Sequence, residues 1–434
     1  MNSRVEIEQT HKKIYCIILD GAADHKISCL QEKTPLEVAF MPNLDFFVQN
    51  GMMSRIEILP STHIPETDSG LMALLGYNPI KYYCGRGALE AIGRGICQGY
   101  QYYVGFRVNF AAYDDGRNVL NRRTSRNLSE NELKSLTDEI ISGIILDKYP
   151  GVNVDLLSYG KHRGILTFYS NNIPLSGNVS NTDPGFLKSG YFSFPVENYD
   201  NKVLKCEPLD DTIAANVTAE IVNDFSEQAH CIMEQSIINS NRIHQGLMKC
   251  NYLLLRDGGS QHISMRKFAE KYNRRLAIYG ELPCEKALAD LIGADFYYSK
   301  ELELQLDKVH LVQLANKLTE SNAEIVFCHI KGPDEPGHDN DPIGKVKAIE
   351  LIDRYFFGEL RMKFQKGDII MVSCDHATPC EIGIHSNDKV PLLVCGNDIE
   401  IDETIHFDEE NAERGRGLLS RAIDVMEFLV ERSK

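Results

Sequence analysis

The chain has 434 residues, with 46 basic and 62 acidic side chains that give a formal net charge of −16. Hydrophobic residues make up 43% and charged residues 25%, which is ordinary for a folded globular protein and excludes general disorder. The negative charge argues against broad affinity for nucleic acid or anionic membranes, and no apolar run is long enough to span a bilayer. The length favours two domains, or one core with a large insertion.

The first residues are charged and lack the apolar stretch of a secretory signal, which predicts a cytoplasmic protein. Cysteine usage agrees with a reducing compartment. None of the twelve cysteines forms a CxxC pair, and several lie inside apolar runs, namely Cys16, Cys328, Cys374 and Cys395. Reduced, buried thiols are the expected state.

Short runs rich in Ile and Val indicate strands near both ends of the chain, at residues 14–19, 325–328, 369–374 and 390–395. Runs this short, and apolar on both faces, suit buried parallel strands. Amphipathic stretches at 302–318 and 345–357 alternate with them, which predicts a doubly wound α/β sheet. Ligands of such sheets bind beyond the carboxyl ends of the strands, where Asp20, Asp375 and His376 would lie.

The alternation is weaker in the middle of the chain. An amphipathic run at 130–145 and an apolar-polar run at 164–169 suggest a smaller α/β unit there. The strand and helix pattern resumes from Arg275. We therefore expect one sheet domain built from residues 1–104 and 259–434, with a second α/β domain inserted at residues 105–258.

Acidic and imidazole side chains follow several of the predicted strands. Asp334 and His338 stand four residues apart with Pro and Gly between them, a spacing that can aim a carboxylate and an imidazole at one cation. Each such residue alone is more often a turn former or a solvated side chain. Ligands that follow separate strands of one sheet converge, however, and mixed O and N ligands suit zinc, manganese or magnesium. The candidate metal ligands are Asp20, Asp334, His338, Asp375, His376 and His385.

A hydroxyl group stands at the start of a further predicted helix. The apolar run from Leu71 has helical spacing and is closed by Gly76, so Thr67, Asp68 and Ser69 fall at the helix N-terminus. One interpretation is structural, with Thr67 or Asp68 as the N-cap. The other is a hydroxyl nucleophile at the positive end of a helix dipole, activated by a metal ion. The residues alone favour neither.

In its motifs the chain resembles the cofactor-independent phosphoglycerate mutases of archaeal type, within the alkaline phosphatase superfamily. The matches occur in order over nearly the whole chain, at residues 19–24, 34–39, 41–45, 74–79, 83–91, 106–109, 162–163, 182–184, 331–338 and 375–379. The resemblance implies an alkaline-phosphatase-like metal-binding domain and an inserted domain that holds a small phosphorylated metabolite. It also implies two divalent metal ions, with manganese or zinc favoured and magnesium or cobalt also acceptable.

The resemblance assigns roles to the candidate residues. One metal would be held by Asp20, Thr67, Asp375 and His376, and the other by Asp334, His338 and His385. Thr67 would be the nucleophile and form a phosphoenzyme, from which the phosphoryl group returns to the other hydroxyl of the glycerate. Candidates for binding the phosphate and carboxylate of the substrate are Arg86, Arg107, Arg122, Arg123, His162, Arg163, Asp183, Arg256 and Lys331.

Three positions depart from the family pattern. Thr67 stands where the family has serine, but its hydroxyl can still act as a nucleophile. Asn121 replaces an aspartate and cannot transfer a proton as an acid or base. Asp257 adds a carboxylate after Arg256, where it would repel an anionic substrate.

Because the candidate metal ligands are intact while these positions differ, three hypotheses stand. The first is phosphoglycerate mutase activity. The second is a hydrolase of a phosphate monoester, diester or phosphonate, or a mutase of another small phosphorylated acid. The third is a metal-binding protein without turnover.

Overall fold

The computed structural model describes residues 12–433, apart from 97–98, 115, 117, 197, 261–263, 299–305 and 397. The chain forms two compact units. The first is built from the described residues up to Ile80 and from Met265 onward, and the second is Lys81–Ser264. The expected boundaries at 104/105 and 258/259 differ from this division, since they fall inside strands β3 (Tyr102–Tyr113) and β9 (Tyr252–Ser260). Each of these strands belongs whole to the sheet of the second unit, which therefore extends further at both ends.

Seven strands form the sheet of the first unit, in the spatial order β11-β10-β12-β1-β13-β14-β2. Their bounds are β1 (Ile14–Leu19), β2 (Gly51–Ile56), β10 (Leu276–Gly280), β11 (Asp295–Tyr298), β12 (Ile325–Ile330), β13 (Ile369–Ser373) and β14 (Val390–Gly396). The strands from β11 to β13 run parallel, as the sequence predicts for the three runs found there.

The prediction of a parallel strand at residues 390–395 is wrong. This run forms β14, which pairs antiparallel with both β13 and β2. A parallel pair needs a crossover connection, usually a helix, and residues 374–389 between β13 and β14 contain no helix. The chain instead turns back along the neighbouring strand.

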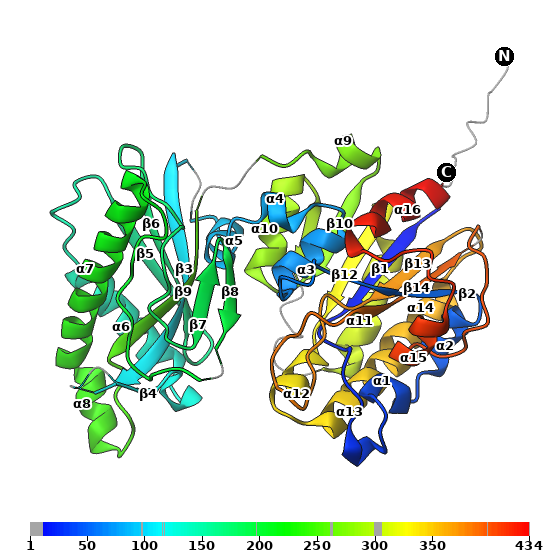
Figure 1. Ribbon diagram of the computed structural model, residues 1–434, viewed down its shortest axis with the longest axis horizontal. Helices are drawn as coiled ribbons and strands as arrows, with labels where there is room; N and C mark the ends of the chain where they lie inside the picture. Colours follow the sequence, from blue (N-terminus) through cyan, green and yellow to red (C-terminus); the bar gives the residue numbers. More distant parts are fainter. Residues whose placement is uncertain are drawn as a thin grey trace. The chain divides into compact units, whose positions relative to one another are not determined.

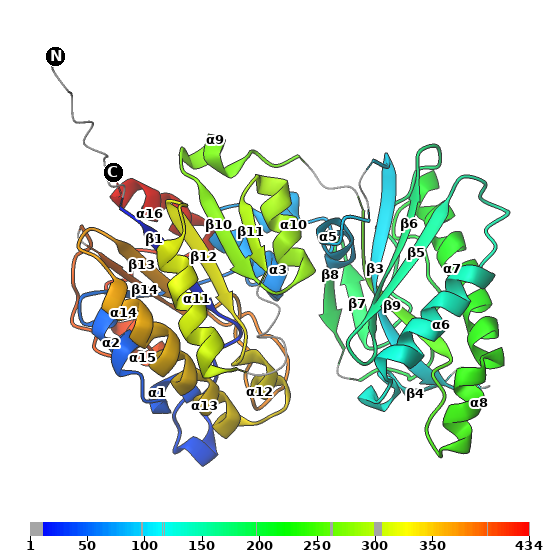
Figure 2. The ribbon, with the colours of Figure 1, turned by 180° about the vertical axis from the view of Figure 1, so that it is seen from behind.

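Helices cover both faces of this sheet, so the doubly wound α/β prediction is confirmed (Figures 1 and 2). Helices α2, α11, α13 and α14 lie on one face, and α3, α10 and α16 on the other. The helical elements of the unit are η1 (Ser28–Leu30), α1 (Pro35–Val38), α2 (Pro42–Val48), α3 (Thr67–Leu74), α9 (Phe268–Tyr272), α10 (Pro283–Ile292), α11 (Lys308–Glu320), α12 (Asp334–His338), α13 (Pro342–Ile352), η3 (Asp353–Phe357), α14 (Gly358–Lys363), α15 (Glu409–Arg414), η4 (Ala422–Asp424) and α16 (Val425–Arg432). A further helix, α4 (Pro79–Tyr82), spans the boundary between the units.

Two of the predicted helices have different bounds in the structure. The stretch at 345–357 is α13 followed by the π-helical turn η3. The stretch at 302–318 corresponds to α11, whose first turn is capped by Asp307, and residues 302–305 lie outside the described part of the chain. Capping by Asp307 explains the later start, because its carboxylate accepts from the amides of Val309 and His310.

The second unit is built on an antiparallel sheet. Its path is β4-β3-β6-β5, with β9 on β3, and β7 and β8 form a separate hairpin. The remaining bounds are β4 (Val119–Asn121), β5 (Asn153–Tyr159), β6 (Arg163–Ser170), β7 (Phe186–Ser189), β8 (Phe192–Pro195), α5 (Arg86–Gly93), η2 (Thr124–Arg126), α6 (Glu130–Gly143), α7 (Ile213–Gln235) and α8 (Ile237–His244).

Strand β3 gives this sheet an apolar face and a polar face. Phe106, Val108 and Phe110 are buried in one hydrophobic core together with residues of α6 and α7. Because side chains alternate along a strand, Arg107 and Asn109 lie on the opposite face. The alternation of β3 thus separates the core of the unit from its cluster of arginines.

Two expectations from composition can be compared with the structure. The eleven cysteines in the described part of the chain are all free thiols, in agreement with the prediction of reduced cysteines. Within the same residues, no helix combines the length and apolar character needed to cross a bilayer.

Candidate active site

Three acidic residues of the first unit gather where three neighbouring parallel strands end. Strand β1 lies between β12 and β13, and Asp20 and Asp375 follow β1 and β13. Asp334 opens the short helix α12 after β12. The side chains of Asp20 and Asp375 are fully buried, so the sheet topology alone brings two carboxylates together away from water.

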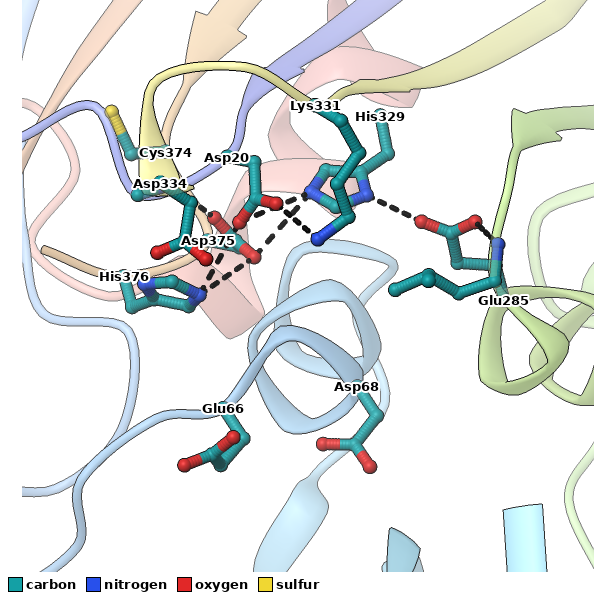
Figure 3. Close-up of polar contacts among 12 residues, drawn as sticks. Asp20, Glu66, Asp68, Glu285, His329, Lys331, Asp334, Cys374, Asp375 and His376 are labelled. Carbon is teal, nitrogen blue, oxygen red and sulfur yellow. Dashed lines mark hydrogen bonds and ion pairs between the residues drawn. The ribbon is translucent and has the colours of Figure 1, made fainter. Parts of the chain in front are cut away.

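The first group of candidate ligands consists of Asp20, Asp375 and His376. His376 Nε2 lies 3.4 Å from Asp20 Oδ1 and 3.2 Å from Asp375 Oδ2. The other oxygen of each carboxylate is occupied, since the Gly21 amide donates to Asp375 Oδ1 at 3.1 Å and the Lys331 ammonium donates to Asp20 Oδ2. Figure 3 shows these groups facing one another. One oxygen of each carboxylate is thus left to face the imidazole.

The second group consists of Asp334, His338 and His385. Asp334 lies 3.4 Å from His338 Nε2 through Oδ2, and 3.6 Å from His385 Nε2 through Oδ1. His338 Nδ1 donates to the Gly383 carbonyl at 2.8 Å, which leaves Nε2 directed toward the cluster. The two groups adjoin, because the rings of His376 and His385 stack with their centroids 3.7 Å apart.

Electrostatics in the cluster favour ionised carboxylates. Burial raises the pKa of Asp375, but the neighbouring His376 and His329 outweigh burial and hold the pKa well below its ordinary value. The pKa of Asp334 is lowered in the same way by His338 and His385, again against burial. Ionised carboxylates and imidazoles gathered in one cluster are the donor set of a divalent cation site.

Unpartnered buried atoms provide an independent test of fit. Within the described residues, Asp20 Oδ1, Asp375 Oδ2 and His376 Nε2 are buried and make no hydrogen bond. Leaving three such atoms unpaired is costly unless they bind something. The residues present therefore fit a divalent cation.

Thr67 is the first residue of α3, and its neighbours place the start of this helix beside both groups. Glu66 Oε1 lies 3.5 Å from His385 Nδ1. One turn on, a Cβ added at Gly70 would come within 2.3 Å of the Asp375 carbonyl oxygen, so only glycine allows this close approach. The buried Thr67 lies between these two contacts in the sequence.

The structural interpretation of Thr67 or Asp68 as the N-cap is wrong. Glu66 is the N-cap residue, and its amide donates to Ser69 Oγ at 3.0 Å. The cap moves one residue upstream because Glu66 is the last residue with extended backbone angles. Capping therefore does not account for the threonine at the first helical position.

Two residues near the cluster escaped the sequence analysis as candidates. His329 Nε2 lies 3.7 Å from Asp20 Oδ1 and 3.5 Å from Asp375 Oδ2, and its Nδ1 contacts the Glu285 carboxylate. The available signal was the position of His329, which directly follows the predicted strand at 325–328 and stands two residues before Lys331. Glu285, in α10, carries no such signal.

The candidate substrate residues of the second unit also lie together. Arg107 on β3 is paired in register with Arg256 on β9, and Asn109 is paired with Arg163 on β6, so the three arginines share one face of the sheet. Burial, then Arg126 and Arg256, lower the pKa of Arg123 to about 10. The cluster therefore holds several like charges close together.

His162 is part of this cluster and is kept neutral by it. Burial, followed by the charges of Arg163 and Arg123, lowers the pKa of His162 to about 3. Its Nδ1 is buried and makes no hydrogen bond within the described residues. Crowded arginines beside a neutral imidazole are an environment in which an anion is strongly favoured.

Several of the predicted substrate residues already have acidic partners. Arg122 forms a fork with Asp183, with Nε donating to Oδ1 at 2.9 Å, and Asp183 is fully buried. Arg86 Nε donates to Glu90 Oε1 at 2.9 Å. Lys331 lies in the first unit, where it pairs with Asp20 as described above. These pairs hold the side chains in fixed orientations.

The two departures in this unit have clear local roles. Asn121 Oδ1 accepts from the amides of Arg123 and Ser125, at 2.9 and 3.0 Å. An amide oxygen and a carboxylate oxygen can both accept these bonds, so asparagine can hold this turn as an aspartate would. Asp257 Oδ2 accepts from Arg107 Nη1 at 3.3 Å and lies 3.7 Å from Arg256 Nε, so its charge is shared between two arginines.

A cavity of about 440 Å³ opens beside this turn, lined by Asn121, Arg122, Arg123, Ser125 and Arg126. Arg126 was not among the sequence candidates. Thr124, Ser125 and Arg126 all have positive φ, at 40°, 59° and 51°. This uncommon backbone places Arg126 on the cavity wall and has no clear sequence signal.

Comparison with known proteins identifies the family. A family model described as 2,3-bisphosphoglycerate-independent phosphoglycerate mutase matches residues 49–239. Proteins of that name from Aeropyrum pernix and Pyrobaculum aerophilum are each 34% identical to this chain, over 89% and 95% of it and 92% and 96% of their own lengths. The chain belongs to this family. Its members are isomerases, and the resemblance noted in the sequence is confirmed.

Solved structures of this kind share the whole fold. A protein from Pyrococcus horikoshii, PH0037, has 26% sequence identity and a TM-score of 0.76, with 98% of each chain covered. A cofactor-independent phosphoglycerate mutase from Thermoplasma acidophilum has 27% identity and a TM-score of 0.63, covering 98% of this chain and 100% of its own. Both units therefore belong to the family architecture, including the inserted one.

Proposed function

We propose that this protein interconverts 3-phosphoglycerate and 2-phosphoglycerate through a phosphothreonine formed on Thr67. The observation that carries this proposal is the meeting of adjoining carboxylates and imidazoles with the N-terminus of α3, in a chain whose relatives are named phosphoglycerate mutases. The cations would be held by Asp20, Thr67, Asp375 and His376, and by Asp334, His338 and His385. Divalent cations in such a site lower the pKa of a hydroxyl and offset the charge that develops on phosphoryl oxygens.

The residues of the first unit hold and receive the phosphoryl group. Thr67 Oγ attacks phosphorus and loses its proton, while the bond from phosphorus to the C3 oxygen of the glycerate breaks and that oxygen takes up a proton. The position of Thr67 at the positive end of α3 favours the bound phosphoryl group. Burial lowers the pKa of Lys331, but Asp20 and Asp334 outweigh burial and raise it above its ordinary value, so Lys331 supplies a fixed positive charge.

The residues of the second unit hold the glycerate between the two transfers. Its carboxylate is assigned to the arginine cluster, with Arg123 and Arg163 as the main partners because neither forms an ion pair with an acidic residue in the described part of the chain. The C2 hydroxyl then attacks the phosphothreonine, which restores Thr67 and gives 2-phosphoglycerate. Arginine suits this role since its planar fork binds a carboxylate with two hydrogen bonds.

A hydrolase is the second candidate function, and Asp257 is the observation that favours it. By pairing with Arg107 and Arg256, its carboxylate removes part of the positive charge that would hold the glycerate. If the glycerate leaves before the second transfer, water attacks the phosphothreonine and releases inorganic phosphate. The substrate would then be a phosphate monoester, a diester or a phosphonate.

One experiment separates the two candidates. The purified protein is loaded with manganese or zinc and incubated with 3-phosphoglycerate, and the products are followed by ³¹P NMR. We expect 2-phosphoglycerate to accumulate to equilibrium with no growth of the inorganic phosphate signal. Stoichiometric release of inorganic phosphate would contradict mutase activity and support the hydrolase.

A further inference from the structure

A further potential ligand atom lies beside Asp20 and Asp375. His329 Nε2 is 3.7 Å from Asp20 Oδ1 and 3.5 Å from Asp375 Oδ2, and its side chain is fully buried. Like the other three atoms, it is buried and makes no hydrogen bond within the described residues. The last strand residues before the site therefore add a second imidazole to a group that already has one.

Four of the six separations between these atoms can be compared with those of one coordination shell. A tetrahedral cation bound at about 2.0–2.1 Å keeps its ligand atoms about 3.3–3.4 Å apart. His376 Nε2 lies 3.4 Å from Asp20 Oδ1 and 3.2 Å from Asp375 Oδ2, and the two distances from His329 Nε2 are 3.7 and 3.5 Å. All four separations lie within a few tenths of an ångström of that edge.

The second polar atom of every member is already held by the protein. As described above, Gly21 and Lys331 occupy the other carboxylate oxygens of Asp375 and Asp20. His376 Nδ1 lies 3.1 Å from Thr378 Oγ1. His329 Nδ1 contacts Glu285 Oε1. Such outer contacts orient metal ligands, and here they leave one buried atom of each residue without a hydrogen-bond partner within the described residues.

Glu285 is itself fixed in position. Its Oε2 accepts from the amides of Glu281 and Leu282, at 2.6 and 2.7 Å, just before α10 begins. With the Glu285 carboxylate accepting at Nδ1, the His329 ring donates its proton there, and a bound cation would take the place of a proton on Nε2. Figure 3 shows His329 between Glu285 on one side and Asp20 and Asp375 on the other.

We propose that His329 is a fourth protein ligand of the cation held by Asp20, Asp375 and His376, and that Glu285 is a positioning residue for its ring. The proposal rests on the proposed function only for the presence of a cation in this group. It revises the expected ligand set, because the Thr67 hydroxyl then approaches a cation that already has four protein ligands and joins it as a fifth.

Metal binding by variants tests this assignment without any substrate. Zinc affinity and stoichiometry are measured by chelator competition for the full chain and for His329→Ala, Glu285→Gln and the control His406→Ala. The control removes another histidine of the same unit that is paired with a carboxylate, since His406 Nδ1 lies 2.8 Å from Asp45 Oδ2. Unlike the buried side chain of His329, the side chain of His406 is 56% exposed. We expect His329→Ala to weaken one of two sites by on the order of 100-fold, Glu285→Gln by about 10-fold or more, and His406→Ala to change nothing. A folded His329→Ala protein that binds both equivalents with unchanged affinity would overturn the proposal.

A structure of the zinc-loaded wild-type protein tests it even if the variants do not fold. The anomalous signal locates the ions directly. We expect His329 Nε2 at about 2.0–2.1 Å from the ion that also contacts Asp20, Asp375 and His376. An ion bound to those three residues with His329 Nε2 more than about 3 Å away would refute the assignment. Neither experiment measures turnover. Both can therefore test His329 as a ligand even if the protein proves to have no mutase activity.

Discussion

The two units of this protein handle charge in opposite ways. In the first unit, carboxylate oxygens lie 3.2–3.6 Å from imidazole nitrogens, and the histidines hold the pKa of Asp375 and Asp334 low. In the second unit, burial and then neighbouring arginines lower the pKa of Arg123 and His162. The first arrangement suits a cation and the second an anion. This contrast supports the proposal that each unit binds one of the two charges needed for metal-dependent phosphoryl transfer.

The largest effect is expected for Thr67→Ala. Without the hydroxyl no phosphoenzyme can form, so kcat should fall by roughly 10⁴-fold or more. Steady-state kinetics with 3-phosphoglycerate measure the fall, and zinc content should stay at the wild-type value because the carboxylates and imidazoles remain. Thr67→Ser is the matched control and should remain active, since it keeps the hydroxyl. Wild-type turnover in Thr67→Ala would remove the proposed nucleophile.

Removal of metal should affect only the first unit. Dialysis against a chelator is expected to lower activity by about 10³-fold, with recovery on adding manganese or zinc. Binding of inorganic phosphate to the arginine cluster, followed by calorimetry, should persist in the metal-free protein. Activity that survives complete chelation, verified by metal analysis, would show that the ligand groups are not catalytic metal sites.

Loss of one arginine should affect only the second unit. Arg163→Ala removes a charge-assisted contact to the substrate carboxylate, so kcat/KM should fall by about 10- to 100-fold while zinc affinity is unchanged. Arg421→Ala is a suitable control, because Arg421 is an exposed arginine paired with Asp424 in the first unit. An equal loss of zinc affinity in Arg163→Ala would break the separation of roles between the units.

The smallest effect concerns the pH dependence of stability. The folded pKa of His162 is about 3, while an unfolded histidine titrates near 6.5. The unfolded state therefore binds more protons between these values, and stability is lost as the pH falls below about 6.5. We expect the Tm of the wild-type protein to drop between pH 7 and pH 5 by a few degrees more than that of His162→Gln. Parallel pH profiles of the two proteins would show that His162 is not held neutral.

The sequence predicts those parts of the fold and site that depend on local pattern. Residues 14–19 and 369–374 are recognisable as strands because both of their faces are buried, and Asp20, Asp375 and His376 follow from where such strands end. The six candidate ligands lie, together with His329, in three overlapping groups of side chains near the carboxyl ends of neighbouring parallel strands.

What the sequence does not reveal depends on contacts between distant residues or on unusual backbone. Glu285 and His329 are 44 residues apart and meet only after β10 and β12 pair. Arg126 lies on the cavity wall because three consecutive residues have positive φ. The residue types in that turn do not predict such a backbone. The direction of β14 likewise depends on a connection without a helix, which a strand pattern by itself does not specify.

The most direct test of the account is the chemical state of Thr67 during turnover. The manganese- or zinc-loaded protein is mixed with 3-phosphoglycerate, quenched in acid within milliseconds to seconds, digested and analysed by mass spectrometry. We predict a phosphorylated peptide with the phosphate on Thr67, which appears before 2-phosphoglycerate and is absent from Thr67→Ala. Formation of 2-phosphoglycerate at full rate with no phosphate on Thr67 at any time would contradict the account.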